Sequence, residues 1–350
     1  MVETTFVELV KEDHDNFNNL FKQIVDDIIS DTTTFSEENQ LSSALSWIGK
    51  VCIYNVPHGK KLRGLLVPLT VRVFLKNPTN IQLNQAYVLG WCVEILQAAF
   101  LVADDIMDKG IMRRGSPCWY LVDNLGADAV NDSWLLEQFV YQLVRKHFGG
   151  TSYYTNLIDL FHQVTQKTVL GQCLDTQTGR NLNFEEYTME RYETIVKYKT
   201  SYYTFYLPIA LATIIATAEN KLANKLEALT MNIGHLFQAV DDYLDCFGSE
   251  MDMGKVGTDI QNGKCSWLFV RSKQLCSKEQ LGVLYENYGN SDNDKVAQVK
   301  KIYECLNITQ HFEQFVQQKK GDFLQAVEEL ENNDLKVLLQ KLLEMVVAKV

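Results

Sequence analysis

The sequence LQAAFLVADDIMD at residues 96–108 ends an apolar run with an acidic cluster, and GHLFQAVDDYLDCF at residues 234–247 repeats the arrangement. In an α-helix, residues one and four positions apart share one edge. Asp104 and Asp108 are therefore expected one above the other, with Asp105 beside them. The second cluster has the same spacing, at Asp241, Asp242 and Asp245. Like charges at this spacing destabilise a helix, so a cation is expected to offset them.

A single acidic cluster of this kind is ordinarily a solvated helix surface. Two copies, each with apolar residues beside it, favour a binding site instead. Carboxylates without His or Cys ligands suit a hard ion such as Mg²⁺, which takes part of its coordination from substrate phosphates. The two clusters therefore predict a site for metal and diphosphate between two helices.

The composition is that of an acidic globular protein. Of 350 residues, 46% are hydrophobic and 22% charged, and 33 basic against 44 acidic residues give a net charge of −11. This balance argues against a nucleic-acid partner. The eight cysteines lack metal-binding spacing, the start resembles no signal or transit peptide, and no apolar run is judged long enough to span a bilayer. We therefore expect a cytoplasmic protein without a membrane span.

Apolar residues recur at helical spacing along the chain, and no stretch alternates as a strand does. Thr34 and Ser36 have the character of a helix start. Helices are expected over residues 5–30, from 36 onward, and over 80–108, 127–148, 153–175, 184–217, 222–246 and 265 to the end. No low-complexity linker or short repeat interrupts them. The sequence therefore predicts one all-α domain over residues 1–350.

Basic residues gather in turns beside, or a loop away from, the acidic clusters. The turns NVPHGKKLRG, MRRGSPCW and GKVGTDIQNGKCSW carry Lys60, Lys61 and Arg63; Arg113 and Arg114; and Lys255, Asp259 and Lys264. Each turn by itself is typical of solvated surface. An acidic protein whose basic residues gather beside its acidic clusters nevertheless indicates a substrate that carries diphosphate, since basic residues beside a helix N-terminus can bind phosphate groups.

Two polar features inside apolar helices leave alternatives open. In GQCLD at residues 171–175, the polar Gln172 and Asp175 are explained equally well by core hydrogen bonding and by function. In YKTSYYTFYLP, Lys199 and Thr200 precede an aromatic patch. Pro208 is expected to kink this helix and free carbonyl groups near them.

Together these motifs resemble those of the trans-prenyltransferases, and within them the insect-type farnesyl diphosphate synthases. The likeness runs from about residue 50 to 275 and is weaker beyond. Its motifs are GKxxRG, LVADDIMD with the downstream RRG, GQxxD, YKT, and FQxxDDYLDCFG followed by GKxGTDIQxxKCSW. The resemblance implies an isoprenoid-synthase helical bundle around a deep central cavity, usually as a homodimer. It also implies head-to-tail joining of isopentenyl diphosphate to an allylic diphosphate.

The resemblance further implies roles for individual residues. Three Mg²⁺ ions per active site would be held by Asp104, Asp108 and Asp241, supported by Asp105, Asp242 and Asp245. The allylic diphosphate would be held by Arg113, Lys199, Gln238, Lys255 and Lys264, and isopentenyl diphosphate by Lys60, Arg63, Gln97 and Arg114. The carbonyl of Lys199 and the hydroxyl of Thr200 would stabilise the allylic cation, with Tyr203 a weaker candidate. The catalytic set is thus Lys199, Thr200, Asp104 and Asp241.

The chain departs from the family pattern in three places. Ala99 and Phe100 stand where relatives commonly carry two aromatic residues, and these positions are expected to set chain length. A small Ala99 implies a roomier pocket, for a longer product or a branched allylic substrate, although ordinary helix packing is the alternative. The tail LLEMVVAKV keeps only Lys349 of a basic flap. In the first basic turn, His58 and Leu62 replace commoner residues.

The expected activity is synthesis of farnesyl diphosphate from dimethylallyl and geranyl diphosphates. The alternatives are a terpene synthase on the same fold, a geranylgeranyl diphosphate synthase, and a non-catalytic regulatory subunit. A terpene synthase needs no second diphosphate site, whereas the basic residues for one are kept here. A regulatory subunit would show decay in an aspartate motif, and neither motif is decayed.

Overall fold

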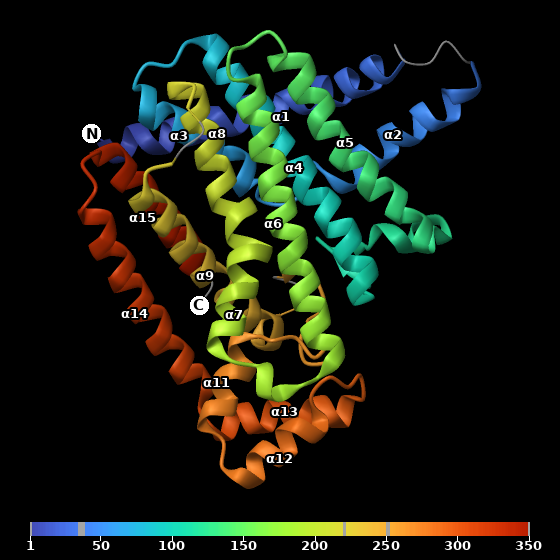
Figure 1. Cartoon of the computed structure of the whole chain (residues 1–350), viewed down its shortest axis with the longest axis vertical. Coiled ribbons are helices and arrows are strands. Elements are labelled where there is room, and N and C mark those ends of the chain that lie inside the picture. The colour runs from blue at the N-terminus through green and yellow to red at the C-terminus, as the bar shows by residue number, and fades with distance from the viewer. Residues whose placement is uncertain (1, 34–38, 220–221, 250–252, 349–350) are drawn as a thin grey trace. The chain divides into compact units, whose positions relative to one another are not determined.

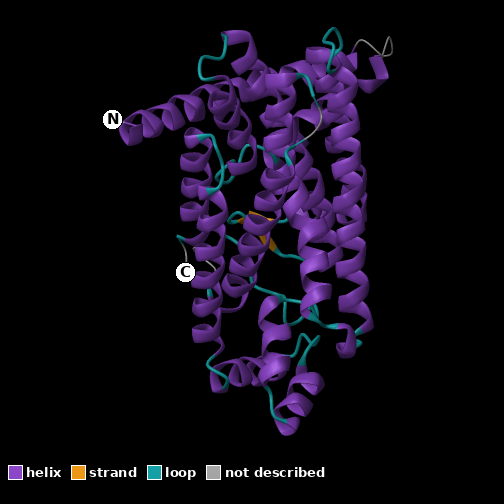
Figure 2. Ribbon diagram, turned by 60° about the vertical axis from the view of Figure 1, so that its left-hand side comes forward, coloured by secondary structure: helices purple, strands orange, loops and turns teal. Residues whose placement is uncertain are grey.

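The computed structural model describes residues 2–33, 39–219, 222–249 and 253–348. Helices dominate it (Figures 1 and 2), and β1 (Met112–Arg113) and β2 (Ser116–Pro117) are the only strands in these residues. The all-α prediction is confirmed, while the helix start at Thr34 and Ser36 lies outside the described residues. The chain forms two compact units. The single domain over residues 1–350 stays a prediction.

Unit 1 consists of Met1–Ile111, Pro117–Gln163 and Phe205–Ala223. Its α-helices are α1 (Val2–Thr33), α2 (Ser42–Asn55), α3 (Leu62–Leu75), α4 (Asn80–Asp108), α5 (Ala129–Phe148), the first part of α6 (Tyr154–Asn181), and α8 (Leu207–Thr217). Short 3₁₀ turns are η1 (Asn39–Leu41), η2 (Trp119–Asn124) and η3 (Gly126–Asp128). Helix α4 packs against α3 and α5, and α3 also packs against α8.

Helix α4 has the predicted bounds because both of its ends are fixed locally. At its start, Thr79 Oγ1 accepts from the Gln82 N–H at 3.3 Å and Gln82 Oε1 accepts from the Thr79 N–H at 2.9 Å, which forms a capping box. Its length and composition would allow it to cross a membrane, which corrects the expectation that no apolar run is long enough. However, 83% of its most apolar stretch is buried inside the protein, which accounts for the apolar composition.

A buried ion pair connects helix α1 to α3 and α4. Asp13 has no exposed surface, and its carboxylate accepts bonds from Arg72 Nε and Nη2, both at 2.8 Å. The hydroxyl of Tyr87 donates a third bond to it at 2.5 Å. All of these donors converge on one carboxylate, so the burial of its charge is compensated.

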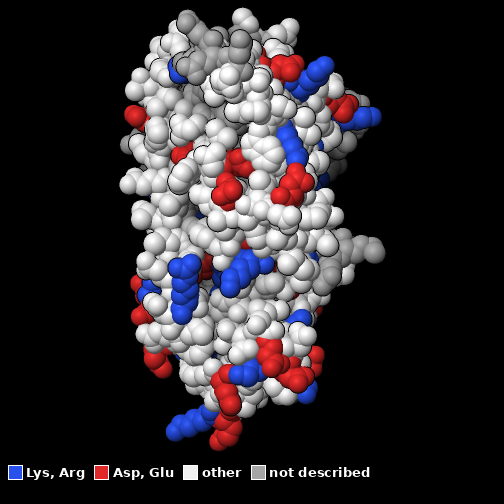
Figure 3. Space-filling view, turned by 90° about the vertical axis from the view of Figure 1, so that its right-hand side faces the viewer, with Lys and Arg blue, Asp and Glu red and all other residues white. Residues whose placement is uncertain are grey.

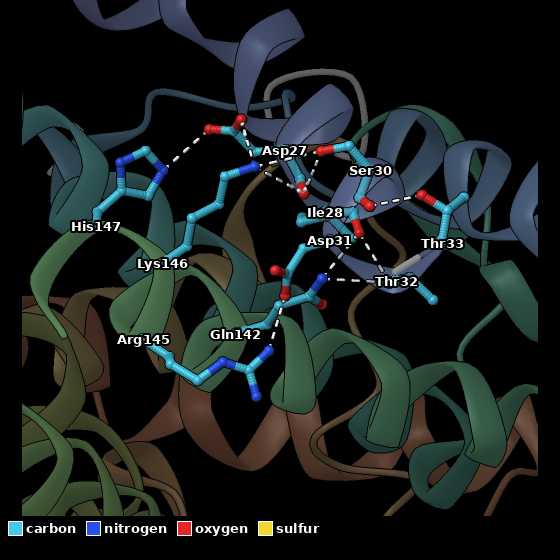
Figure 4. A network of polar contacts seen from close by, with 10 residues as sticks. All are labelled: Asp27, Ile28, Ser30, Asp31, Thr32, Thr33, Gln142, Arg145, Lys146 and His147. Carbon is cyan, nitrogen blue, oxygen red and sulfur yellow. Dashed lines mark hydrogen bonds and ion pairs between the residues drawn. The ribbon is translucent and has the colours of Figure 1, made fainter. Parts of the chain in front are cut away.

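A second polar network joins the last turns of α1 and α5 (Figure 4). Asp27 receives Lys146 Nζ at 2.8 Å and pairs with His147 Nε2 at 2.9 Å, and Asp31 receives Arg145 Nη2 at 2.8 Å. Arg145 and Lys146 place positive charge at the carboxyl end of α5, where it also interacts favourably with the helix dipole.

Unit 2 consists of Met112–Ser116, Val164–Thr204 and Asn224–Val350. Its helices are the second part of α6, η4 (Phe184–Glu186), α7 (Met189–Val196), most of η5 (Lys197–Tyr206), α9 (Asn224–Phe247), α11 (Trp267–Leu275), α12 (Lys278–Asn287), α13 (Asn293–Cys305), α14 (Ile308–Glu328) and α15 (Asn333–Val347). Helix α9 packs against α7, α11, α14 and α15. On the face drawn in Figure 3, acidic and basic side chains lie interspersed among uncharged ones.

The segment before Pro208 is a π-helix, η5. Pro208 is the second residue of α8, which follows η5 without a break, and it has no N–H to donate to the turn before it. The wide turns therefore lie directly ahead of Pro208, while the kink expected there stays a prediction. Such π segments are frequent at functional sites, and this one carries Lys199 and Thr200.

Candidate active site

The second aspartate motif, at the end of α9, separates into residues with different surroundings. Asp242 is 4% exposed and accepts bonds from the Trp267 N–H at 2.8 Å and from Gln238 Nε2 at 2.9 Å. Burial, together with repulsion from Asp241, raises the pKa of Asp242 to about 7 against the effect of these bonds. Asp241, in contrast, has a side chain that is 43% exposed. Asp242 therefore belongs to the interior, and Asp241 is the carboxylate that solvent and ligands can reach.

Asp241 and Asp245 converge on one cation, the ammonium group of Lys255. Its Nζ lies 3.1 Å from Asp241 Oδ2 and 3.9 Å from Asp245 Oδ2. Burial raises the pKa of Asp245, although Lys255 and the Asp259 N–H oppose this shift. Two carboxylates that share a cation fit a hard metal ion. Within the described residues no three or more His, Cys, Asp or Glu side chains form a metal-binding group, so an ion would need oxygens from water or substrate as well.

A hydrogen-bonded chain leads from the π-helix to the second aspartate motif. The Thr200 hydroxyl donates to Gln238 Oε1 at 2.7 Å, and Gln238 Nε2 donates to Asp242 at 2.9 Å. These bonds fix the orientation of the Gln238 amide and commit the only proton of the Thr200 hydroxyl. The lone pairs of Thr200 Oγ1 are therefore left to face an electron-poor group.

Lys199 and Lys264 meet at Asp175, a residue that the sequence left between two explanations. Their Nζ atoms lie 2.6 and 2.9 Å from the same oxygen, Asp175 Oδ2. Burial disfavours the charged carboxylate, but the two ammonium groups outweigh it and hold the pKa of Asp175 well below its usual value. Asp175 is thus both hydrogen-bonded in the core and paired with two of the predicted substrate ligands.

The turn between β1 and β2 carries Arg113 and Arg114. Arg114 and Gly115 have left-handed backbone conformations, with φ of 53° and 76°. The Gly115 N–H donates to the Gly254 carbonyl at 2.9 Å, which fastens this turn to the loop of Lys255. Unit 2 therefore brings together the predicted residues Arg113, Arg114, Lys199, Thr200, Gln238, Asp241, Asp242, Asp245, Lys255 and Lys264.

In unit 1 the first aspartate motif ends α4, with Asp105 buried and with Asp104 and Asp108 half-buried. Gln97 is 8% exposed, and its buried Oε1 has no hydrogen-bond partner among the described residues. Buried amide oxygens ordinarily have a donor, so this atom suits a residue that binds a ligand. Unit 1 also carries the predicted Lys60, Arg63, Ala99 and Phe100.

Glu94, a residue of α4, makes a contact that was not predicted from the sequence. The residue is 3% exposed, and its carboxylate accepts a hydrogen bond from the Gly64 N–H at the start of α3, at 2.8 Å. Gly64 lies against α4 so closely that a Cβ there would be 2.9 Å from the Gly90 carbonyl oxygen. These contacts hold the basic turn that precedes α3. A Glu in an apolar run is the only signal that could have indicated them.

Two aspartate motifs on helices, together with buried lysine–carboxylate pairs, are typical of an enzyme that acts on phosphorylated substrates. The family model of polyprenyl synthetases matches residues 45–306. Farnesyl pyrophosphate synthase of Saccharomyces cerevisiae is 39% identical over 328 residues, 91% of this chain and 92% of that protein. The proteins of that name from Gallus gallus and Homo sapiens are 40% identical over 330 and 328 residues, covering 93% and 92% of this chain and 89% and 77% of theirs.

The chain therefore belongs to the polyprenyl synthetase family, which confirms the resemblance to the prenyltransferases. The roles assigned to individual residues, and a site that uses both aspartate motifs, stay predictions.

Proposed function

We propose that the chain is a farnesyl diphosphate synthase, which joins isopentenyl diphosphate to dimethylallyl diphosphate and then to geranyl diphosphate. The observation that carries this proposal is the similarity, over most of both chains, to proteins named farnesyl pyrophosphate synthase. The gathering of lysines and carboxylates in unit 2 supports it, since two of these lysines share one carboxylate.

The basic residues divide between two diphosphates. Arg113, Lys199, Gln238, Lys255 and Lys264 hold the allylic diphosphate, and Lys60, Arg63, Gln97 and Arg114 hold isopentenyl diphosphate. Asp104, Asp108 and Asp241 would hold Mg²⁺, three ions per active site, with Asp105, Asp242 and Asp245 in support. When bound, Mg²⁺ supplies Lewis-acid stabilisation of the leaving diphosphate.

The protein stabilises the charges that form when the allylic C–O bond breaks. Lys199, Lys255 and Lys264 stabilise the diphosphate anion. The Thr200 oxygen, whose proton is committed to Gln238, presents lone pairs to the allylic cation, and the Lys199 carbonyl adds its dipole. The alkene of isopentenyl diphosphate forms the new C–C bond to the allylic cation, which leaves a positive charge on the former isopentenyl unit. The departed diphosphate removes a proton beside that charge, and the C–H electron pair forms the new double bond. No side-chain nucleophile is required.

Incubation with labelled isopentenyl diphosphate and allylic primers of several lengths tests the function. We expect label in farnesyl diphosphate from both the dimethylallyl and the geranyl primer. Turnover of an allylic diphosphate without incorporation of label would favour a terpene synthase. A product that consists mainly of geranylgeranyl diphosphate would favour that synthase instead.

Substitutions in the two anion sites should separate the two substrates. We expect Lys60→Ala and Arg114→Gln to raise mainly the KM for isopentenyl diphosphate, each by about tenfold or more, since a lost charge-assisted bond costs about 1.5–3 kcal/mol. Lys264→Ala should act chiefly on the KM for the allylic substrate. Steady-state kinetics and melting temperatures check this, and equal effects of all three variants on both substrates would contradict the assignment.

Ala99 is proposed to widen the pocket for the allylic chain. Ala99 is 3% exposed, so a larger side chain at this position must displace its neighbours. We expect Ala99→Phe to spare condensation on dimethylallyl diphosphate. With ethyl-branched or farnesyl-length primers, we expect it to lower kcat/KM by about 10–200-fold or more, the range for one methylene in an apolar pocket.

The measurement is kcat/KM for each primer with both proteins. Because the unchanged protein should accept at least one larger primer, a primer ranking shared by both proteins would assign Ala99 to ordinary core packing.

We further propose a cytoplasmic location and a homodimer. All eight cysteines are free thiols, which is typical of a reducing compartment. A relative from Arabidopsis thaliana is named as mitochondrial, so compartments differ among similar proteins.

A further inference from the structure

One face of helix α6 carries Gly171, Asp175 and Gly179 at four-residue spacing, so the three residues lie in line along it. Each touches a segment that carries a predicted ligand of the allylic diphosphate. We name this row the Gly–Asp–Gly strip. Its members have different tasks, which follow from the atoms that they contact.

The two glycines let the backbones of both lysine-bearing segments approach α6. A Cβ at Gly171 would lie 2.2 Å from the Lys199 backbone nitrogen and 2.6 Å from the Tyr198 carbonyl carbon. A Cβ at Gly179 would lie 2.9 Å from the Asn262 carbonyl oxygen, two residues before Lys264. Backbone atoms cannot yield as a flexible side chain can. The π-helix and the loop are therefore both seated on α6, one at each end of the strip.

Asp175 lies between these contacts and receives both ammonium groups. Its side chain is 7% exposed, and those of Lys199 and Lys264 are 25% and 11% exposed. Two lysines at such close quarters would repel one another without a counter-charge. A lysine without a partner also has many rotamers, and a substrate that binds it must bear the cost of ordering it. Asp175 removes both obstacles before any substrate arrives.

We propose that Asp175 is a positioning residue that holds Lys199 and Lys264 together in the geometry that grips one diphosphate group. The inference rests on the proposed assignment of these two lysines to the allylic diphosphate. In this role Asp175 acts through the two lysines, which engage its charge, and not through contact with the substrate. The negative charge of Asp175 repels the diphosphate. Its contribution to binding therefore comes from the positions in which it holds the two lysines, and not from electrostatic attraction.

A charge-neutral and a charge-keeping substitution test the proposal, with Asp159→Asn as control. Asp159 is an exposed residue of the same helix. We expect Asp175→Asn to lower kcat/KM for geranyl diphosphate by about 100-fold, as misplacement of binding groups does, with the KM for isopentenyl diphosphate nearly unchanged. Asp175→Glu keeps the charge but shifts both lysines, so it should fold and still lose at least about tenfold. The Asp159→Asn control should match the unchanged protein.

Calorimetric binding of inorganic diphosphate in the presence of Mg²⁺ gives a readout apart from turnover. We expect Asp175→Asn and Lys264→Ala to weaken it alike. If Asp175→Asn bound diphosphate more tightly, removal of the negative charge would matter more than the positions of the two lysines. That result would overturn the proposal. Equal changes in the KM of both substrates, or loss of folding in both Asp175 variants, would make Asp175 a purely structural residue.

Lys264→Ala separates this inference from the assignment on which it rests. If Lys264→Ala leaves the allylic KM and diphosphate binding unchanged, the assignment of that lysine is wrong. If Lys264→Ala weakens both while Asp175→Asn weakens neither, the assignment stands and the positioning role is wrong.

Discussion

Asp241→Ala is expected to lower kcat by about a thousandfold or more, because in the proposed mechanism Asp241 would help to hold the Mg²⁺ that stabilises the leaving diphosphate, an effect of several kcal/mol. Its melting temperature should stay close to that of the unchanged protein, since the Asp241 side chain is 43% exposed. Asp104→Ala should lower kcat to a similar degree. Chelation of Mg²⁺ should abolish turnover of the unchanged protein.

The neighbouring Asp242→Ala is the matched comparison. Asp242 is buried and holds both the Trp267 N–H and the Gln238 amide, so its loss should lower the melting temperature as well as the activity. Steady-state kinetics and thermal melts of the two variants distinguish these roles. Undiminished turnover in EDTA would contradict the mechanism. The same changes in kcat and melting temperature for both variants would contradict the different roles of the two aspartates.

Asp13→Ala should lower the free energy of unfolding by about 3–5 kcal/mol, the cost of breaking a buried ion pair by removing one partner. The expectation follows from the complete burial of Asp13 and from its three bonds to Arg72 and Tyr87. Urea unfolding provides the measurement.

Asp15→Ala, an exposed position of the same helix, is the control and should change the unfolding free energy little. Should the two substitutions shift the urea midpoint equally, the ion pair of Asp13 with Arg72 contributes no net stability. Kinetic constants of correctly folded Asp13→Ala should match those of the unchanged protein, because none of the proposed ligands lies in its network.

The helices could be predicted from sequence where periodicity and end signals agree. Helix α4 has the expected bounds because the Thr79 and Gln82 capping box and the polar Asp108 end lie at the limits of its apolar pattern. Helix α6 continues to Asn181, beyond the predicted residue 175, because no proline closely follows Asp175 and Gly179 lies inside the helix, where it allows close approach of the Asn262 carbonyl. Single residues of a motif mark a boundary poorly when they face inward.

Many of the predicted site residues lie together in unit 2, but the sequence does not distinguish their surroundings. The spacing in DDYLD treats Asp241 and Asp242 alike, whereas their exposure and partners divide them. Asp175 was undecided because nothing local reveals that Lys199 and Lys264, 24 and 89 residues further along, both reach it. Contacts of that sequence separation depend on how helices and loops pack, which periodicity does not contain.

The wide turns of η5 make the count of residues in this segment as important as their identity. A π-helix takes more residues per turn than an α-helix, so deletion of one residue between positions 201 and 206 would allow it to close into ordinary α-helix. The removed residue is the one that the wider turns accommodate, so the segments on either side would nearly keep their faces, whereas the same deletion in an α-helix rotates them by about 100°. The backbone that carries Lys199 and Thr200 would nevertheless be rebuilt, since both residues lie inside the π-helix. In an alignment of relatives, a one-residue gap here would therefore mark a change from π-helix to α-helix in the segment of Lys199 and Thr200.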